Sequence, residues 1–195
     1  MMLDAISPLG HAFGAATDLA SITLEGATER SDLGAVLCVT TSDGAQFAKA
    51  LGEVLGCALP TQHGKFTTSA QKRAIWLSPR SWVVLCDPLE EAGLVDAVAA
   101  AYPDHAAVAS RFTDALGWIL LDGNAAEMLL RQGSFLSFDA EGFPVGHAKR
   151  TLVAEIPAVI LRETETKWLI GVERSRTRYF ADWLGGLTHS FGDKT

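Results

Sequence analysis

The sequence contains few charged residues for its length. Only 20% of its 195 residues are Asp, Glu, Lys or Arg, whereas 48% are hydrophobic, and soluble domains average about 25% charged residues. Two interpretations follow from this shortage. Either the folded chain keeps apolar surface that a partner covers, or Ala-rich helices fill a large core.

The chain also lacks a surplus of basic residues and a long apolar run. Its 23 acidic and 16 basic residues give a net charge of −7, which argues against nucleic acid as a partner because phosphate binding needs clustered Lys and Arg. No apolar run reaches the roughly 18 residues of a membrane-spanning helix. The first 14 residues include Asp4 but no Lys or Arg, unlike the basic start of a signal peptide. We therefore expect a cytoplasmic protein with no membrane partner.

Cysteine is scarce. The three cysteines are Cys38, Cys57 and Cys86, an odd number without Cys-x-x-Cys spacing. This pattern does not indicate a disulfide framework. We expect reduced, buried thiols, as is usual in a cytoplasmic protein.

Motifs for catalysis, cofactor binding and metal binding are missing. The sequence has neither a G-x-S-x-G nucleophile elbow nor the glycine-rich or Walker lysine motifs of nucleotide-binding proteins. The histidines are scattered without the H-x-H or H-E-x-x-H spacing of a zinc site. We therefore predict that this chain carries no catalytic, cofactor-binding or metal-binding residue. The histidines are His11, His63, His105, His147 and His189.

The first half of the chain has the pattern of an α+β unit. It predicts a strand, a helix, two strands, a helix and a strand, which is the order of a split βαβ, ferredoxin-like unit. These elements span residues 35–40, 45–55, 74–77, 82–86, 89–101 and 106–112. Asp43 is expected to cap the first helix. Residues 1–33 are expected to form an irregular arm with a strand near residues 22–24.

The second half of the chain predicts a further α+β unit. Its expected strands and first helix span residues 117–121, 125–132, 148–154, 158–162 and 168–172, and a last helix opens at Arg174-Ser175. Asn124 and Ser175 are expected to cap the two helices. The predicted fold is therefore α+β, with two ferredoxin-like-type subdomains of antiparallel sheet and helices packed on one face. The predicted domains are residues 1–112 and 113–195, with the boundary at Phe112–Ala115.

Four sequence motifs occur in an order that resembles a known family. They are Ile75 to Val84 with two tryptophans, Leu121 to Leu130, Phe143-Pro144-Val145-Gly146 followed by Thr151-Leu152, and Arg174-Ser175 followed by Trp183-Leu184. Together they resemble the folate-binding aminomethyltransferase fold and, within it, the gamma subunit of heterotetrameric sarcosine oxidase. Two positions depart from that pattern: Ser134 stands where cysteine is expected, and Phe138-Asp139 where a leucine-rich pair is usual.

The resemblance implies a non-catalytic subunit of an oxidoreductase complex. Alpha, beta and delta subunits would be its partners, chiefly alpha, and FAD, FMN, NAD and tetrahydrofolate would be bound by those other subunits. Such a complex demethylates sarcosine to glycine, releases hydrogen peroxide and passes the one-carbon unit to tetrahydrofolate.

The resemblance also implies where a folate-binding member would carry an acidic residue. That residue follows the strand equivalent to 148–154, in a Gly-rich turn that here is expected at Glu155-Ile156-Pro157-Ala158. The turn lacks the Gly-Gly-Asp motif. Pro157 also restricts the backbone dihedral angles at a place where the family needs the conformational freedom of glycine. We therefore expect the folate site to be lost. The alternative hypothesis is a free-standing folate-binding or aminomethyltransferase-like protein.

Three arginines, Arg174, Arg176 and Arg178, crowd the start of the last helix. Positive charge there is unfavourable unless an anionic group lies nearby. One interpretation is a solvated face that pairs with Glu173 or Asp182. The other is an interface with a partner subunit, because Arg is favoured in bidentate interface pairs.

Overall fold

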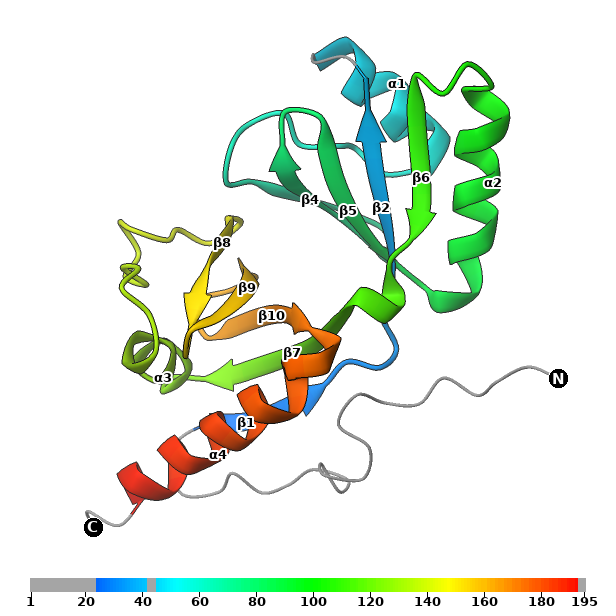
Figure 1. Ribbon diagram of the computed structural model, residues 1–195. Helices are drawn as coiled ribbons and strands as arrows, with labels where there is room; N and C mark the ends of the chain where they lie inside the picture. The colour runs from blue at the N-terminus through cyan, green and yellow to red at the C-terminus, as the bar shows by residue number, and fades with distance from the viewer. Residues whose placement is uncertain (1–23, 42–44, 193–195) are drawn as a thin grey trace, which may run out of the picture. The chain divides into compact units, whose positions relative to one another are not determined.

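The computed structural model describes residues 24–41 and 45–192, which fall into two compact units. We call residues 32–114 with 146–149 the split-βαβ unit. The described parts of residues 1–31, 115–145 and 150–195 form the meander unit. Each contains a five-stranded sheet, and Figure 1 shows the two sheets with their helices. The predicted α+β class with two antiparallel sheets is confirmed.

The split-βαβ unit has the predicted strand arrangement with one addition. Its elements are β2 (Gly34–Thr40), α1 (Ala45–Leu55), β3 (Phe66–Ser69), β4 (Lys72–Ser78), β5 (Ser81–Cys86), η1 (Pro88–Glu90), α2 (Glu91–Ala101), β6 (Ala107–Arg111) and η2 (Thr113–Ala115). The sheet order is β3-β4-β5-β2-β6, so β5 separates the strands β2 and β4 as a split βαβ requires. Strand β3 lies between the predicted helix 45–55 and strand 74–77, where the sequence predicted no strand.

Both long helices of this unit share one core with the sheet. Leu51 and Leu55 of α1 and Val98 of α2 are fully buried in the same cluster as Val36 and Val84. The buried residues of α1 recur at helical spacing, which places them on one face. The predicted helix 45–55 is confirmed as α1. Its expected cap, Asp43, lies outside the described residues.

The meander unit has a different strand order. Its elements are β1 (Leu24–Glu29), β7 (Leu116–Gly123), α3 (Ala126–Gln132), β8 (Ala148–Val153), β9 (Ile156–Arg162), β10 (Lys167–Glu173), η3 (Arg174–Arg176) and α4 (Thr177–Gly192). The sheet order is β1-β7-β10-β9-β8. No helix separates β9 from β10, so the last three strands form a meander and β10 returns beside β7. The unit therefore differs from a split βαβ.

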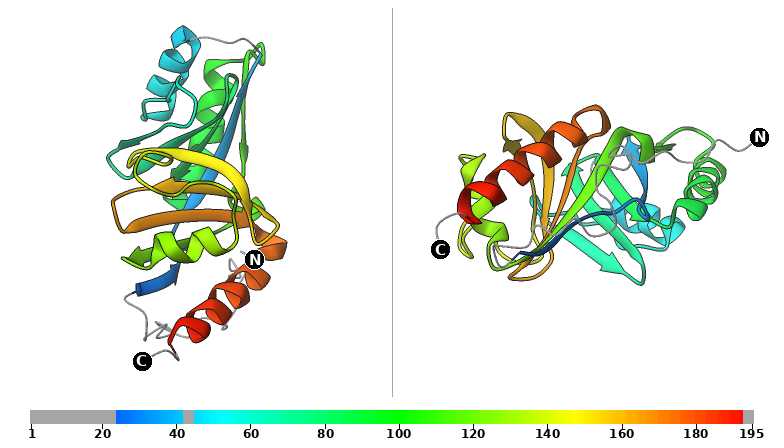
Figure 2. Two further views of the ribbon diagram at one scale, coloured as in Figure 1. Left: turned by 90° about the vertical axis from the view of Figure 1, so that its left-hand side faces the viewer. Right: turned by 90° about the horizontal axis from the view of Figure 1, so that it is seen from below.

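Helices α3 and α4 pack on one face of the meander sheet. Leu129 of α3 and Phe180 of α4 are fully buried in one cluster with Ile119, Ile160 and Ile170. Figure 2 shows both helices from below, beside the strands. The strand residues of this cluster alternate along β7, β9 and β10, as expected when one sheet face meets helices.

The division of the chain differs from the predicted domains 1–112 and 113–195. Strand β1 pairs with β7 over five residue pairs, so residues 24–31 belong to the meander unit instead of the first domain. Residues 146–149, which include the first two residues of β8, belong to the split-βαβ unit, where His147 bridges Lys65 and the Ala148 amide donates to Gly64 O at 2.9 Å. Pairing between residues distant in sequence decides both assignments.

Two predicted helix caps are wrong. Helix α3 has Ala125 at its N-cap with no side-chain hydrogen bond, so Asn124 does not cap it. Ser175 lies inside the 3-10 turn η3, and α4 begins at Thr177. The buried Thr177 hydroxyl donates to Glu173 O at 3.1 Å.

Candidate functional site

The three predicted interface arginines lie in consecutive turns at the start of α4. Arg174 and Arg176 belong to η3, and Arg178 is exposed in the first turn of α4. Arg176 Nε lies 3.2 Å from Glu173 Oε2, and both side chains are about half exposed. This ion pair matches the solvated interpretation of the cluster. An exposed pair of this kind stabilises a fold by about 0–1 kcal/mol, so the fold does not depend on Arg176.

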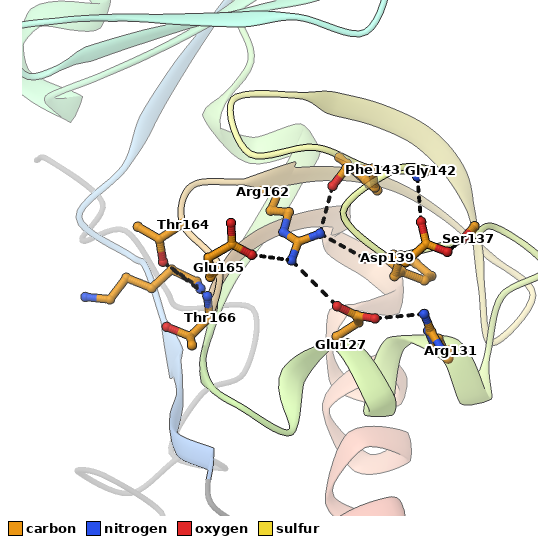
Figure 3. Close-up of polar contacts among 12 residues, drawn as sticks. Glu127, Arg131, Ser137, Asp139, Gly142, Phe143, Arg162, Thr164, Glu165 and Thr166 are labelled. Carbon is orange, nitrogen blue, oxygen red and sulfur yellow. Dashed lines mark hydrogen bonds and ion pairs between the residues drawn. The ribbon is translucent and has the colours of Figure 1, made fainter.

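The meander unit contains a buried arginine that sequence analysis missed. Arg162 ends β9 and is 2% exposed. Its Nη1 donates to two backbone carbonyls, Phe138 O at 3.0 Å and Phe143 O at 2.9 Å. Its Nη2 lies 3.0 Å from Glu165 Oε2 and 3.6 Å from Glu127 Oε2. Figure 3 shows the guanidinium between these partners.

Arg162 also lies inside an aromatic cluster. Its guanidinium carbon is 4.7 Å from the centroid of the Trp168 ring, within the range of a cation–π interaction. Phe138 and Phe143 stack on each other at 5.9 Å between centroids, and both meet Trp168 edge-on. All three rings are fully buried. The arginine and the rings therefore fix two points of the segment between α3 and β8.

We call residues 133–145 of this segment the Phe135 loop. Asp139 organises its turn by accepting hydrogen bonds from the Ser137 hydroxyl at 2.5 Å and the Gly142 amide at 2.6 Å. The Ser137 hydrogen bond is the main reason that the pKa of Asp139 lies below its ordinary value. Phe138-Asp139 was one of the departures from the family pattern. Here the pair supplies one buried anchor and one turn-forming carboxylate.

A second buried charge lies in the split-βαβ unit. Glu91, at the start of α2, is 2% exposed and accepts hydrogen bonds from the amides of Phe112 and Thr113, at 3.1 and 3.2 Å. It also accepts from the Thr113 hydroxyl at 2.7 Å and Arg111 Nε at 3.1 Å. Burial raises the pKa of this carboxyl, but these hydrogen bonds outweigh it and the pKa is lowered. Glu91 thus holds the end of β6 against α2.

The reactive side chains of the described residues do not converge. Residues 24–41 and 45–192 contain no group of three or more His, Cys, Asp or Glu that could hold a metal ion. Cys38, Cys57 and Cys86 are free and buried. Burial raises the pKa of Cys38 to about 12 and that of Cys86 to about 11, so both remain protonated thiols at neutral pH. Among the helices described, none is long and apolar enough to cross a membrane.

The turn expected to replace a folate site has a different position. Ala154 and Glu155 join β8 to β9, with φ angles of 51° and 64°. Two positive φ angles are typical of a type I′ hairpin turn. Ile156, Pro157 and Ala158 lie in β9, so the prediction of a turn over residues 155–158 is wrong. Glu155 is exposed.

Solved structures with the same fold include two informative proteins. A chain of the heterotetrameric sarcosine oxidase from Corynebacterium sp. U-96, in complex with pyrrole 2-carboxylate, superposes with a TM-score of 0.85 and 21% identity, over 98% of both chains. Glycine cleavage system aminomethyltransferase T from Bartonella henselae superposes with a TM-score of 0.63 and 10% identity, over 93% of this chain and 50% of that chain. At these identities the similarity shows the fold, which is the predicted aminomethyltransferase-like fold.

Similar sequences carry a common name. The sarcosine oxidase subunit gamma of Corynebacterium sp. (strain P-1) is 29% identical over 69% of this chain and 66% of its own length. The corresponding subunit of an Arthrobacter species is 26% identical over 75% of this chain and 71% of its own length. The chain thus matches about two thirds of the length of these relatives. A model of the sarcosine oxidase, gamma subunit family matches residues 40–189. On this match, which covers most of the sequence, the chain belongs to the sarcosine oxidase gamma subunit family.

Proposed function

We propose that this chain is the non-catalytic gamma subunit of a cytoplasmic heterotetrameric sarcosine oxidase. Membership of the gamma subunit family across residues 40–189 carries the proposal. The partners are the alpha, beta and delta subunits, chiefly alpha, and FAD, FMN, NAD and tetrahydrofolate bind to those subunits. The complex oxidises sarcosine to glycine, releases hydrogen peroxide and transfers the one-carbon unit to tetrahydrofolate.

The chemistry of the described residues supports a non-catalytic role. The buried charged groups Arg162 and Glu91 bind backbone groups of their own units. Both side chains therefore stabilise the fold of their own unit. Glu155, the one acidic candidate for a folate site, is exposed on a two-residue hairpin turn. A carboxylate in that position is hydrated.

The arginine cluster supports a contact with the alpha subunit. Arg176 is half exposed and its pair with Glu173 is solvated, so the Arg176 guanidinium remains available to a carboxylate of another chain. Arg178 is exposed two residues further along. An acidic surface on alpha would offset the unfavourable placement of these cations at a helix start.

Reconstitution tests the proposed function. The purified full chain should be colourless and should show no tetrahydrofolate binding by calorimetry. Alpha, beta and delta subunits purified without this chain should regain stable, sarcosine-dependent peroxide release when it is added. A flavin spectrum that stays with the isolated chain, or tetrahydrofolate binding that Glu155→Ala abolishes, would instead support a free-standing folate-binding protein.

A further inference from the structure

A pocket of about 480 Å³ lies beside the C-terminal half of α1 in the split-βαβ unit. Small-molecule sites have volumes of about 300–1,000 Å³. Two side chains of opposite charge, Lys49 and Glu53, line this pocket together. We propose that it binds a neutral α-amino acid, with the ligand carboxylate at Lys49 and the ligand ammonium group at Glu53. This inference does not rest on the proposed function.

The backbone that closes the pocket is held in place by the fold. Gly56 ends α1 with a φ of 65°, and the Cys57 amide then donates to Gly52 O at 3.0 Å. An added Cβ at Gly52 would lie 2.9 Å from Cys57 O, so this segment packs directly against the helix. Further along, Pro60 O accepts a hydrogen bond from the buried Trp82 Nε1 at 2.7 Å. The pocket is therefore formed before a ligand binds, as is usual for small-molecule sites.

The charges along α1 match the two ends of a zwitterion. Glu53 lies in the last turn of the helix, where the helix dipole adds negative charge and favours an ammonium group. Lys49 lies one turn earlier on the same side, and Cβ atoms at this spacing are about 5–6 Å apart. One α-amino acid can reach both side chains because its ammonium and carboxylate groups are attached to the same carbon atom.

The two charges are available to a ligand. Both side chains are exposed, and neither forms an ion pair with a residue of the described ranges 24–41 and 45–192. Lys49 precedes Glu53 in the helix, which is the less favourable order for a pair four residues apart. Leu59, also in the pocket lining, supplies apolar surface for the side chain of the ligand.

Titration of the full, isotope-labelled chain with L-valine, followed by amide NMR shifts, tests this inference. Saturable shifts are expected at the amides of Gly52, Gly56 and Leu59, with a Kd of about 1 mM or tighter. Isovalerate lacks the ammonium group of valine, and isobutylamine lacks the carboxylate. Each should bind at least about fivefold more weakly than L-valine, because each loses one charged contact.

Variants of the two charged residues provide a second measurement. Lys49→Gln and Glu53→Gln should each weaken L-valine binding about fivefold. Asp96→Asn is the matched control, because it removes an exposed negative charge from α2 outside the pocket lining. Its affinity for L-valine should stay within about twofold of that of the unaltered chain. Circular dichroism should be unchanged in all three variants.

Two kinds of result would overturn the inference. One is the absence of saturable shifts at the pocket amides with L-valine at about 20 mM. The other is equal binding of L-valine, isovalerate and isobutylamine, or unchanged affinity in both Gln variants, since either would show that the charges do not select a zwitterion. The proposed function would stand in each case, because it depends on assembly with the other subunits.

Discussion

Replacing Arg162 by methionine tests the role of the buried guanidinium in the meander unit. The change removes the Arg162 hydrogen bonds to Phe138 O and Phe143 O, at about 1–3 kcal/mol for each bond. It also removes the contact with Trp168, worth about 0.5–2 kcal/mol. The substitution also removes the buried Arg162 Nε, which has no hydrogen-bond partner among the described residues. Removing this unsatisfied group offsets about 1–3 kcal/mol of the lost stability. The ion pair with Glu165 is discounted because that carboxylate is 75% exposed.

The expected result is a loss of about 3 kcal/mol in the free energy of unfolding of the meander unit. Urea titration followed by tryptophan fluorescence measures it, since Trp168 lies in the affected cluster. Arg131→Met is the matched control: Arg131 pairs with Glu127 at 2.8 Å but is about half exposed, so its loss should cost about 0.5 kcal/mol or less. A loss below about 1 kcal/mol for Arg162→Met would refute the account of the anchored loop.

Three further predictions concern a buried carboxylate, two glycines and the arginine cluster. The folded-state pKa of Glu91 is lowered from its ordinary 4.5, so Glu91 contributes stability above pH 4.5 that is lost as the pH falls through the folded pKa. Glu91→Gln should remove this pH-dependent contribution to stability. The melting temperature of the variant should therefore change less with pH below 5. Gly171→Ala should destabilise the meander unit by about 1–3 kcal/mol or more, because the added Cβ would lie 2.6 Å from the Trp118 ring. Gly93→Ala, in α2 with nothing within 4 Å, should instead stabilise the chain by up to about 1 kcal/mol; equal effects in thermal melts would contradict this. Arg176→Glu should leave the melting temperature of the isolated chain nearly unchanged but weaken its capture by the alpha subunit, and unaltered capture would assign the cluster to the solvated face.

Local patterns in the sequence predicted most of the elements. Helix 45–55 has apolar residues at helical spacing, and apolar runs predicted the strands at residues 74–77 and 82–86. Such signals depend only on neighbours in the chain. The pairing of β1 with β7 depends on residues about 95 positions apart, and no local pattern in residues 24–29 identifies that partner.

The buried arginine could not be recognised for a related reason. Arg162 ends an apolar strand, where a charged residue usually marks exposure, and its acceptors are backbone carbonyls of a loop. Carbonyl groups belong to every residue, so the sequence contains no sign of this pairing. The hairpin turn at Ala154 and Glu155 was misplaced because neither residue is a usual choice for positive φ. Pro157 suggested a turn but lies in β9.

Native mass spectrometry of the chain co-expressed with alpha, beta and delta subunits tests the central claim most directly. The account predicts one copy of this chain in a complex with one copy of each other subunit, and flavin mass associated only with those subunits. A chain that is recovered entirely by itself from this co-expression, with the other three subunits assembled into an active oxidase, would contradict the account.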